Sequence, residues 1–180
     1  MFLELWQLVY IFIIGLVLAL LEIEIEGPNG WAKNLPTKRI KFWWSEKLGK
    51  ELTGYHTALV CLLLLFFHLP MVLDLNFSWQ KELLILTQYL YFVVYWDFLW
   101  FVLNPNFRLK DFKKGGVPWH STWFLKAPTE YWILAVMAVI VPGIIYGWHA
   151  SIVQLYYVAV YAGLTIFTII VFSVFYREKL

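Results

Sequence analysis

Residues 82–103 read ELLILTQYLYFVVYWDFLWFVL, a run in which Asp97 is the single charged side chain after Glu82. A helix crosses the hydrocarbon core of a bilayer with about 20 consecutive apolar residues. The run is therefore long and apolar enough to predict a transmembrane helix. Asp97 is then an ionisable group placed inside that helix.

The whole chain of 180 residues shares this apolar character. Hydrophobic residues make up 62% of it, aromatic residues 21% and charged residues only 14%, and the mean hydropathy is +0.69. A soluble domain usually carries about 25% charged residues. The composition excludes an ordinary soluble domain and predicts one all-α integral membrane domain over residues 1–180.

Four further apolar runs have the length of a membrane span. Glycine and proline or clusters of charge separate them, except for a short turn at 147–151 between the last two. Without that turn, residues 131–175 would form one helix far too long for a bilayer. The sequence therefore predicts a bundle of five transmembrane helices, with spans at about 2–23, 55–74, 82–103, 131–148 and 152–175.

Positive charge predicts the orientation of this bundle. Lys and Arg gather in the first and third loops and at the C-terminus, whereas the second and fourth loops contain Lys81 alone. Loops rich in Lys and Arg remain on the cytoplasmic side. We expect the N-terminus outside and the C-terminus inside, in a prokaryotic inner membrane or a plasma membrane.

Aromatic and basic residues alternate in both cytoplasmic loops. Trp43 and Trp44 lie among lysines in the first loop, and Trp119 and Trp123 lie near Lys126 in the third. Such amphipathic segments lie in the headgroup layer. We expect membrane lipids as partners, and the loops are too short to predict a nucleic-acid interface. A homo-oligomer or a membrane partner protein is left open.

Seven polar side chains from different regions map to the cytoplasmic end of the predicted bundle. Topology alone brings them together, because the first and third spans end at this face and the second and fourth begin there. They are the carboxylates of Glu22, Glu26, Asp97 and Glu130, the imidazoles of His56 and His120, and the amide of Asn104.

Asp97 is the group in this set that is hardest to explain by a local role. It lies about 10 Å inside the end of its span, at 1.5 Å per residue, which is too deep for helix capping. An Asp at the centre of a span costs about 2.5–3.5 kcal/mol on insertion scales. We therefore expect Asp97 to face the bundle interior, where its neighbours would be Glu22 or Glu26 and one of the two histidines.

Carboxylates and imidazoles that converge inside a helix bundle are typical ligands of iron, manganese and zinc. The expected metal ligands are Glu22, Glu26, His56, Asp97, His120 and Glu130. No metal motif matches by spacing, since the chain has no His-x-x-x-His pair, Glu-x-x-His pair or cysteine cluster. The metal hypothesis therefore depends on convergence alone.

These residues predict a small membrane enzyme that acts on a lipid or another amphipathic molecule reaching it from the inner leaflet. Asp97, Glu22 and His120 are the expected catalytic acid and base groups, with Asn104 positioning the substrate. The reaction itself cannot be read from the sequence.

Other interpretations remain open. The glutamates could pair with loop lysines, the histidines could bind backbone groups, and Glu130 could serve the start of its helix. His68 and His149, near the opposite face, could be a pair of haem ligands. The chain could also be a small-solute transporter, a substrate-binding membrane subunit or a non-catalytic scaffold. Against transport, the sequence has no inverted repeat and few ionisable groups in mid-bundle.

Overall fold

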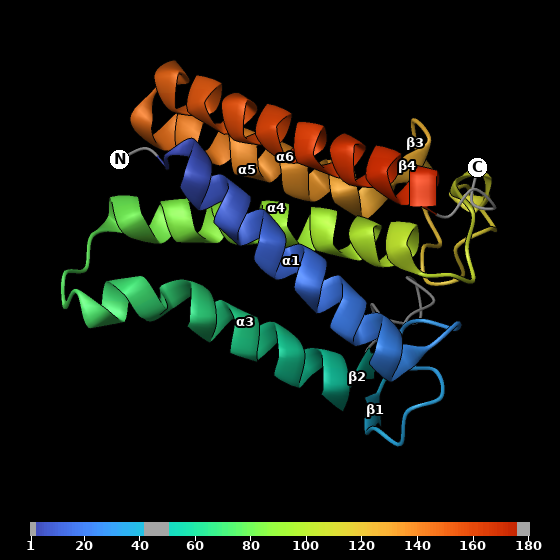
Figure 1. Cartoon of the computed structure of the whole chain (residues 1–180). Coiled ribbons are helices and arrows are strands. Elements are labelled where there is room, and N and C mark those ends of the chain that lie inside the picture. Colours follow the sequence, from blue (N-terminus) through green and yellow to red (C-terminus); the bar gives the residue numbers. More distant parts are fainter. Residues whose placement is uncertain (1–2, 42–50, 176–180) are drawn as a thin grey trace.

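The computed structural model describes residues 3–41 and 51–175. Five long helices account for most of these residues (Figure 1). They are α1 (Leu5–Glu26), α3 (Gly54–Leu73), α4 (Trp79–Leu103), α5 (Thr129–Tyr146) and α6 (Trp148–Phe175). Each is long and apolar enough to cross a membrane, so the five predicted spans are confirmed as helices of spanning length.

Helix α4 is the centre of the bundle. The other four helices all pack against it, and α3 and α5 lie on opposite sides of it (Figure 1). Aromatic residues of α4, among them Phe92, Tyr95 and Trp96, are buried in the core. This explains why the sequence of α4 is apolar around its whole circumference, as expected for a helix without a solvent-facing side.

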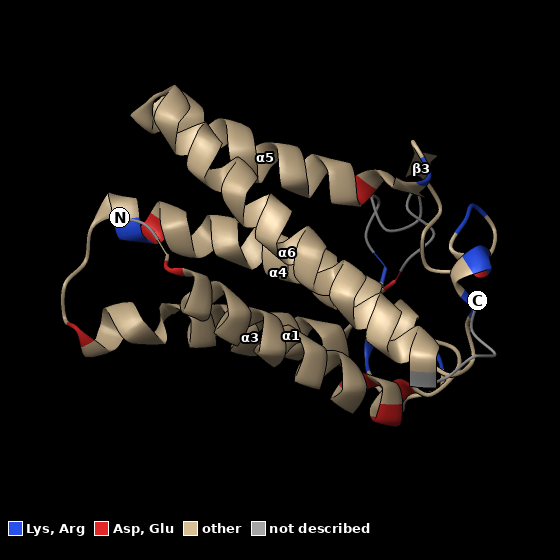
Figure 2. Ribbon diagram, turned by 45° about the horizontal axis from the view of Figure 1, so that its top comes forward, with Lys and Arg blue, Asp and Glu red and all other residues tan. Residues whose placement is uncertain are grey.

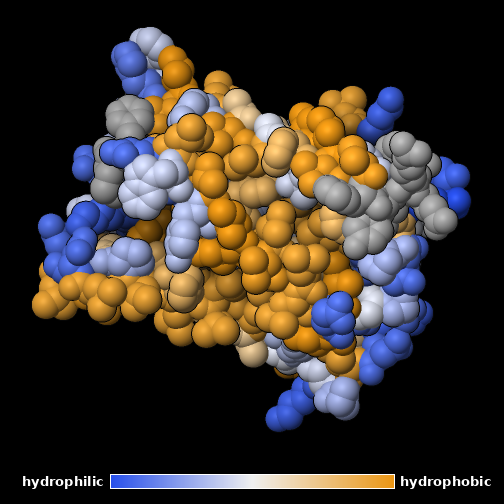
Figure 3. All heavy atoms as spheres, viewed as in Figure 1, coloured by the Kyte–Doolittle hydropathy of each residue, from blue (hydrophilic) through white to orange (hydrophobic). Residues whose placement is uncertain are grey.

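The surface of the bundle matches a membrane environment. Lys, Arg, Asp and Glu lie mostly at the two ends of the helices (Figure 2). The face in Figure 3 shows a band of hydrophobic side chains between hydrophilic ends. Leu65, Ile144 and Phe167 are among many exposed large hydrophobic residues, and soluble monomers rarely expose a continuous apolar surface of this kind.

Several helix boundaries differ from the sequence prediction, and two of these differences change the local structure. Helix α1 continues to Glu26, three residues beyond the predicted end, so its acidic residues lie on the helix. Helix α6 begins at Trp148, and Gly147 alone separates it from α5. The φ angle of Gly147 is +87°, a conformation that glycine adopts without penalty, which allows a reversal within one residue.

Glycines allow two close contacts between helices. A Cβ atom at Gly15 would overlap the ring of Tyr95 on α4, and one at Gly143 would overlap the hydroxyl of Ser151 on α6. Gly163 differs from these two glycines, because a Cβ atom there would meet open space in the described part of the chain.

The segments at the end of the bundle that holds the acidic end of α1 fold back against the helices. Strands β1 (Arg39–Ile40) and β2 (Leu52–Thr53) pair antiparallel, as do β3 (Trp123–Phe124) and β4 (Ala127–Pro128). A 3₁₀ turn, η1 (Leu109–Asp111), follows α4.

The loop tryptophans test the prediction of ordered loops. Trp119 is buried against Trp100 and Phe107, and Trp123 packs on Phe112, as expected for a loop that covers the bundle. The other two tryptophans, Trp43 and Trp44, lie outside the described residues.

Close packing at Gly15 can be tested with a matched pair of substitutions. We expect Gly15→Ala to destabilise the protein by about 1–3 kcal/mol, because the added methyl group forces the Tyr95 ring to move. Gly163→Ala adds the same group to open space and should be neutral or stabilising. Thermal unfolding in detergent measures both, and equal effects would contradict the packing.

Candidate functional site

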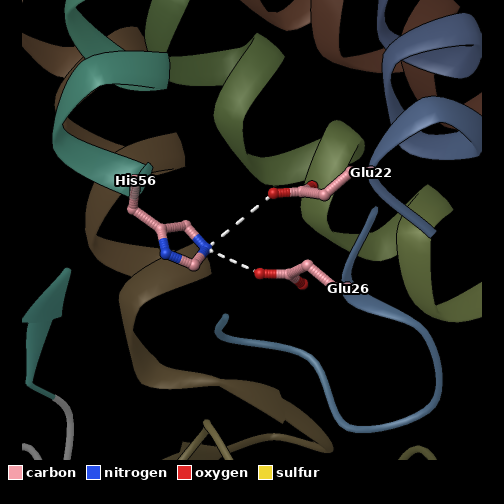
Figure 4. Close-up of side chains that lie close together, drawn as sticks. All are labelled: Glu22, Glu26 and His56. Carbon is pink, nitrogen blue, oxygen red and sulfur yellow. Dashed lines mark ion pairs between the residues drawn. The ribbon is translucent and has the colours of Figure 1, made fainter. Parts of the chain in front are cut away.

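Two glutamates of α1 and a histidine of α3 form a compact cluster. Nε2 of His56 lies 3.3 Å from Oε1 of Glu26 and 3.8 Å from Oε1 of Glu22 (Figure 4). The two glutamates are one helical turn apart on the same face of α1, and both are buried. One ligand atom from each of the three residues lies within 4.8 Å of the others.

The orientation of His56 is fixed on two sides. Its Nδ1 lies 2.7 Å from Oγ1 of Thr53, the residue that caps α3 by accepting a hydrogen bond from the His56 backbone N–H. The same hydroxyl therefore caps the helix and holds the imidazole. The indole of Trp31 stacks on the ring at a centroid distance of 4.2 Å. These contacts direct Nε2 toward the glutamates.

Trp31 reaches this position because the chain after α1 makes a left-handed turn. Gly30, Trp31 and Ala32 all have positive φ, at 61°, 50° and 48°. This conformation costs non-glycine residues about 1–2 kcal/mol each. The backbone N–H of Ala32 donates to Oε1 of Glu26 at 2.5 Å, so the turn fixes this carboxylate as well as the indole.

A second cluster contains Asp97, His120 and Glu130. Nε2 of His120 lies 2.9 Å from Oδ2 of Asp97, and Nδ1 lies 2.6 Å from Oε1 of Glu130. The Tyr131 hydroxyl also donates to Oδ2 of Asp97. The imidazole side chain is 3% exposed, whereas those of Asp97 and Glu130 are 29% and 37% exposed, so a buried ring joins two more accessible carboxylates.

The segment between α4 and α5 builds this second cluster. Leu125 and Lys126, both with positive φ, form the two-residue turn between β3 and β4, and this hairpin leads directly into α5 with Glu130 in its first turn. The Trp123 indole N–H donates to the backbone oxygen of His120 at 2.9 Å. The hairpin thus fixes both His120 and its partner on α5.

Both clusters line one cavity of about 360 Å³. Helices α1, α3, α4 and α5 all contribute to it, together with the turns at Gly30 and Trp119. Its polar end holds Glu22, Glu26, His56, Asp97, His120 and Glu130. The rest of the lining is mostly aromatic and aliphatic, as is common for sites that bind small organic molecules.

The predicted convergence is thus found for six of the seven residues. Asp97 faces the interior and contacts a histidine, as its insertion cost required. Asn104 is fully buried, and within the described chain it lies outside the cavity lining. Its Nδ2 donates to the Gly27 oxygen, and its Oδ1 accepts from Asn106, so it joins the ends of α1 and α4.

The rings of His56 and His120 contact side chains, a hydroxyl for His56 and two carboxylates for His120, where the local alternative expected backbone groups. His68, a candidate haem ligand, contacts the Leu64 carbonyl through Nδ1 and Glu82 through Nε2. Glu130 contacts His120 and does not simply serve the start of α5.

Sequence reasoning missed three residues of the site. Trp31 stacks on His56, Thr53 holds the same ring and Tyr131 binds Asp97. A signal existed for Tyr131, since it follows Glu130 directly. For Trp31, the preceding glycine and proline predicted a turn but not its direction.

Comparison of the chain with protein families, with curated proteins and with solved structures finds no match in any of the three. The candidate function therefore has to come from the site itself.

Proposed function

We propose that the protein is a small integral membrane enzyme that binds a divalent metal ion at Glu22, Glu26 and His56 and acts on a lipid or another amphipathic molecule. The observation that carries this proposal is the approach of one imidazole nitrogen to two buried carboxylates, at 3.3 Å and 3.8 Å. Iron, manganese and zinc all accept this mixture of oxygen and nitrogen ligands.

The surroundings of His56 support a cation at this position. Carboxylates that are close together and shielded from water stay ionised only with a compensating positive charge, and otherwise one of them takes up a proton. Near this end of the bundle, the described Lys and Arg residues all lie in loops outside the five helices. His56, by contrast, faces both carboxylates directly (Figure 4). The hydrogen bond at Nδ1 is the type of outer contact that orients a metal-bound histidine.

A metal ion bound there would supply Lewis-acid chemistry or an activated water molecule. The chain itself supplies proton transfer through the second cluster. Both ring nitrogens of His120 already face carboxylates, so we assign His120, Asp97 and Glu130 to acid and base chemistry and not to metal binding. The Tyr131 hydroxyl holds Asp97 in place at the cavity wall.

The proposed orientation is N-terminus outside and C-terminus inside, which places the cavity at the cytoplasmic face of a prokaryotic inner membrane or a plasma membrane. It is supported by the loop charges, because the connections on the cavity side carry most of the Lys and Arg residues.

Reporter fusions test this orientation. A reporter inserted between Asn76 and Gln80 should be external, and one fused after Leu180 should be cytoplasmic. The reason is that the C-terminal residues of α3 and of α6 lie at opposite ends of the bundle. Reporters on the same side would contradict the five-span arrangement, and exchanged sides would contradict the orientation alone.

Metal analysis of the detergent-purified protein tests the function. We expect stoichiometric iron, manganese or zinc in the wild type. Glu26→Gln and His56→Ala should lower the metal content to background, because each removes one of three ligands. Glu24→Gln is the matched control, since Glu24 lies on the same helix turn but is exposed, and it should retain the metal.

An absence of metal in the wild type, after incubation with each of the three ions, would contradict the metal site. Retention of the metal by Glu26→Gln and His56→Ala would place it elsewhere. Transport in liposomes without bound metal would favour the transporter interpretation instead.

Substitutions at two helix caps distinguish an effect on stability from an effect on metal binding. Thr53→Ala and Ser78→Ala each remove the cap of a helix, α3 and α4, and each should cost about 1 kcal/mol of stability. Only Thr53 also holds His56, so Thr53→Ala alone should weaken metal binding, by about 10–100-fold. Thermal unfolding and metal titration measure the two effects, and equal metal affinities would contradict the role of Thr53.

A further inference from the structure

The cavity extends from the two clusters toward the middle of the bundle. Its lining follows one face of α3 through His56, Val60 and Cys61, and follows α4 back from Trp100 to Val93. At 1.5 Å per residue, the seven positions from Trp100 to Val93 correspond to about 10 Å along the helix axis. The polar groups lie at one end of this length, and the far end is apolar.

Several residues that line the cavity are also exposed on the outer surface of the bundle. Thr57, Val60 and Cys61 line the cavity and are also exposed on the surface of α3. On the other side, Leu134 of α5 is half-buried. Because α3, α4 and α5 all contribute lining residues here, we place the opening between α3 and α5, over α4.

The polar end of the cavity holds the ligand set of the proposed metal site, Glu22, Glu26 and His56. A metal ion held by these residues would accept an oxygen atom of a head group as a further ligand, because iron, manganese and zinc all bind oxygen ligands.

We infer that the substrate of the proposed enzyme is a single-chain amphipath with an oxygen-bearing head group, which reaches the site sideways from the bilayer between α3 and α5. This inference rests on the proposed function, since it names the molecule that the same site would take. The head group lies among the two clusters, and the alkyl chain lies along Val60, Cys61, Val93, Val94 and Leu134.

The geometry favours this path over one from water. A chain that lies along the apolar end keeps its methylene groups out of water throughout, and each buried methylene group contributes about 0.8 kcal/mol relative to water. At the polar end, His120 and Trp119 are buried, and Trp31 covers His56. A fully water-soluble substrate would leave the apolar part of the cavity without a partner.

Photolabelling of the full chain in phosphatidylcholine nanodiscs tests the inference. The probe is dodecanoic acid with a diazirine in mid-chain, and the labelled peptides are identified by mass spectrometry. We expect adducts at 57–61, 93–94 and near Leu134. Unlabelled dodecanoic acid should prevent labelling, whereas dodecyltrimethylammonium, which has the same chain without an oxygen, should not.

Matched variants locate the opening. Val60→Trp fills the opening and should lower cavity labelling about tenfold. Leu62→Trp should leave the labelling unchanged, because Leu62 is 62% exposed and is not among the described residues that line the cavity.

The outcomes separate the two proposals when the metal content of each preparation is measured. Labelling spread over the lipid-facing surface, equal competition by both amphipaths, or equal labelling of Val60→Trp and Leu62→Trp would overturn the sideways path. Stoichiometric metal in that same preparation would leave the proposed enzyme intact. Cavity labelling without any metal would support the path and overturn the metalloenzyme.

Discussion

Compensation of buried carboxylates is the constraint on which the rest of this structure depends. Four acidic groups from three helices line one cavity at the end of an apolar bundle; Glu22 and Glu26 are buried, and Asp97 and Glu130 are partly exposed. In such an environment an isolated carboxylate is strongly disfavoured, and removing one partner of a buried pair typically costs about 3–5 kcal/mol. Two histidines are the nearest compensating groups, and neither reaches its carboxylates without help from a loop or a helix cap.

The loop conformations follow from this constraint. The left-handed turn at Gly30, Trp31 and Ala32 is unfavourable by itself, but it supplies a backbone donor to Glu26 and a ring against His56. Such strain persists only where surrounding contacts determine the conformation, and it is common at functional sites. The order of these loops is therefore a consequence of the acids beneath them.

The sequence predicted the bundle and the convergence of the site for physical reasons that need no side-chain geometry. Spanning length is visible in any long apolar run, and five crossings place alternate helix ends at one face. The inward direction of Asp97 followed from its cost in lipid. The pairing of each carboxylate with a histidine could not be predicted, because it depends on ring rotation and on turns such as Gly30 to Ala32. Asn104 shows the same limit. From the sequence alone, a polar residue that joins two helix ends cannot be distinguished from one that lines the site.

The two histidines show how the same residue type acquires two different roles in one cavity. Both nitrogens of His120 face carboxylates, an arrangement suited to passing protons between Glu130 and Asp97. In His56 one nitrogen is held by a hydroxyl, and the other is aimed at two carboxylate oxygens. In the His120 cluster each ring nitrogen already has a carboxylate partner, whereas in the His56 cluster one ligand atom from each of three residues lies within 4.8 Å of the others. This difference in partners, and not the identity of the residues, is why we assign proton transfer to one cluster and metal binding to the other. The apolar walls around both clusters then strengthen each interaction, because charges attract more strongly where water is excluded.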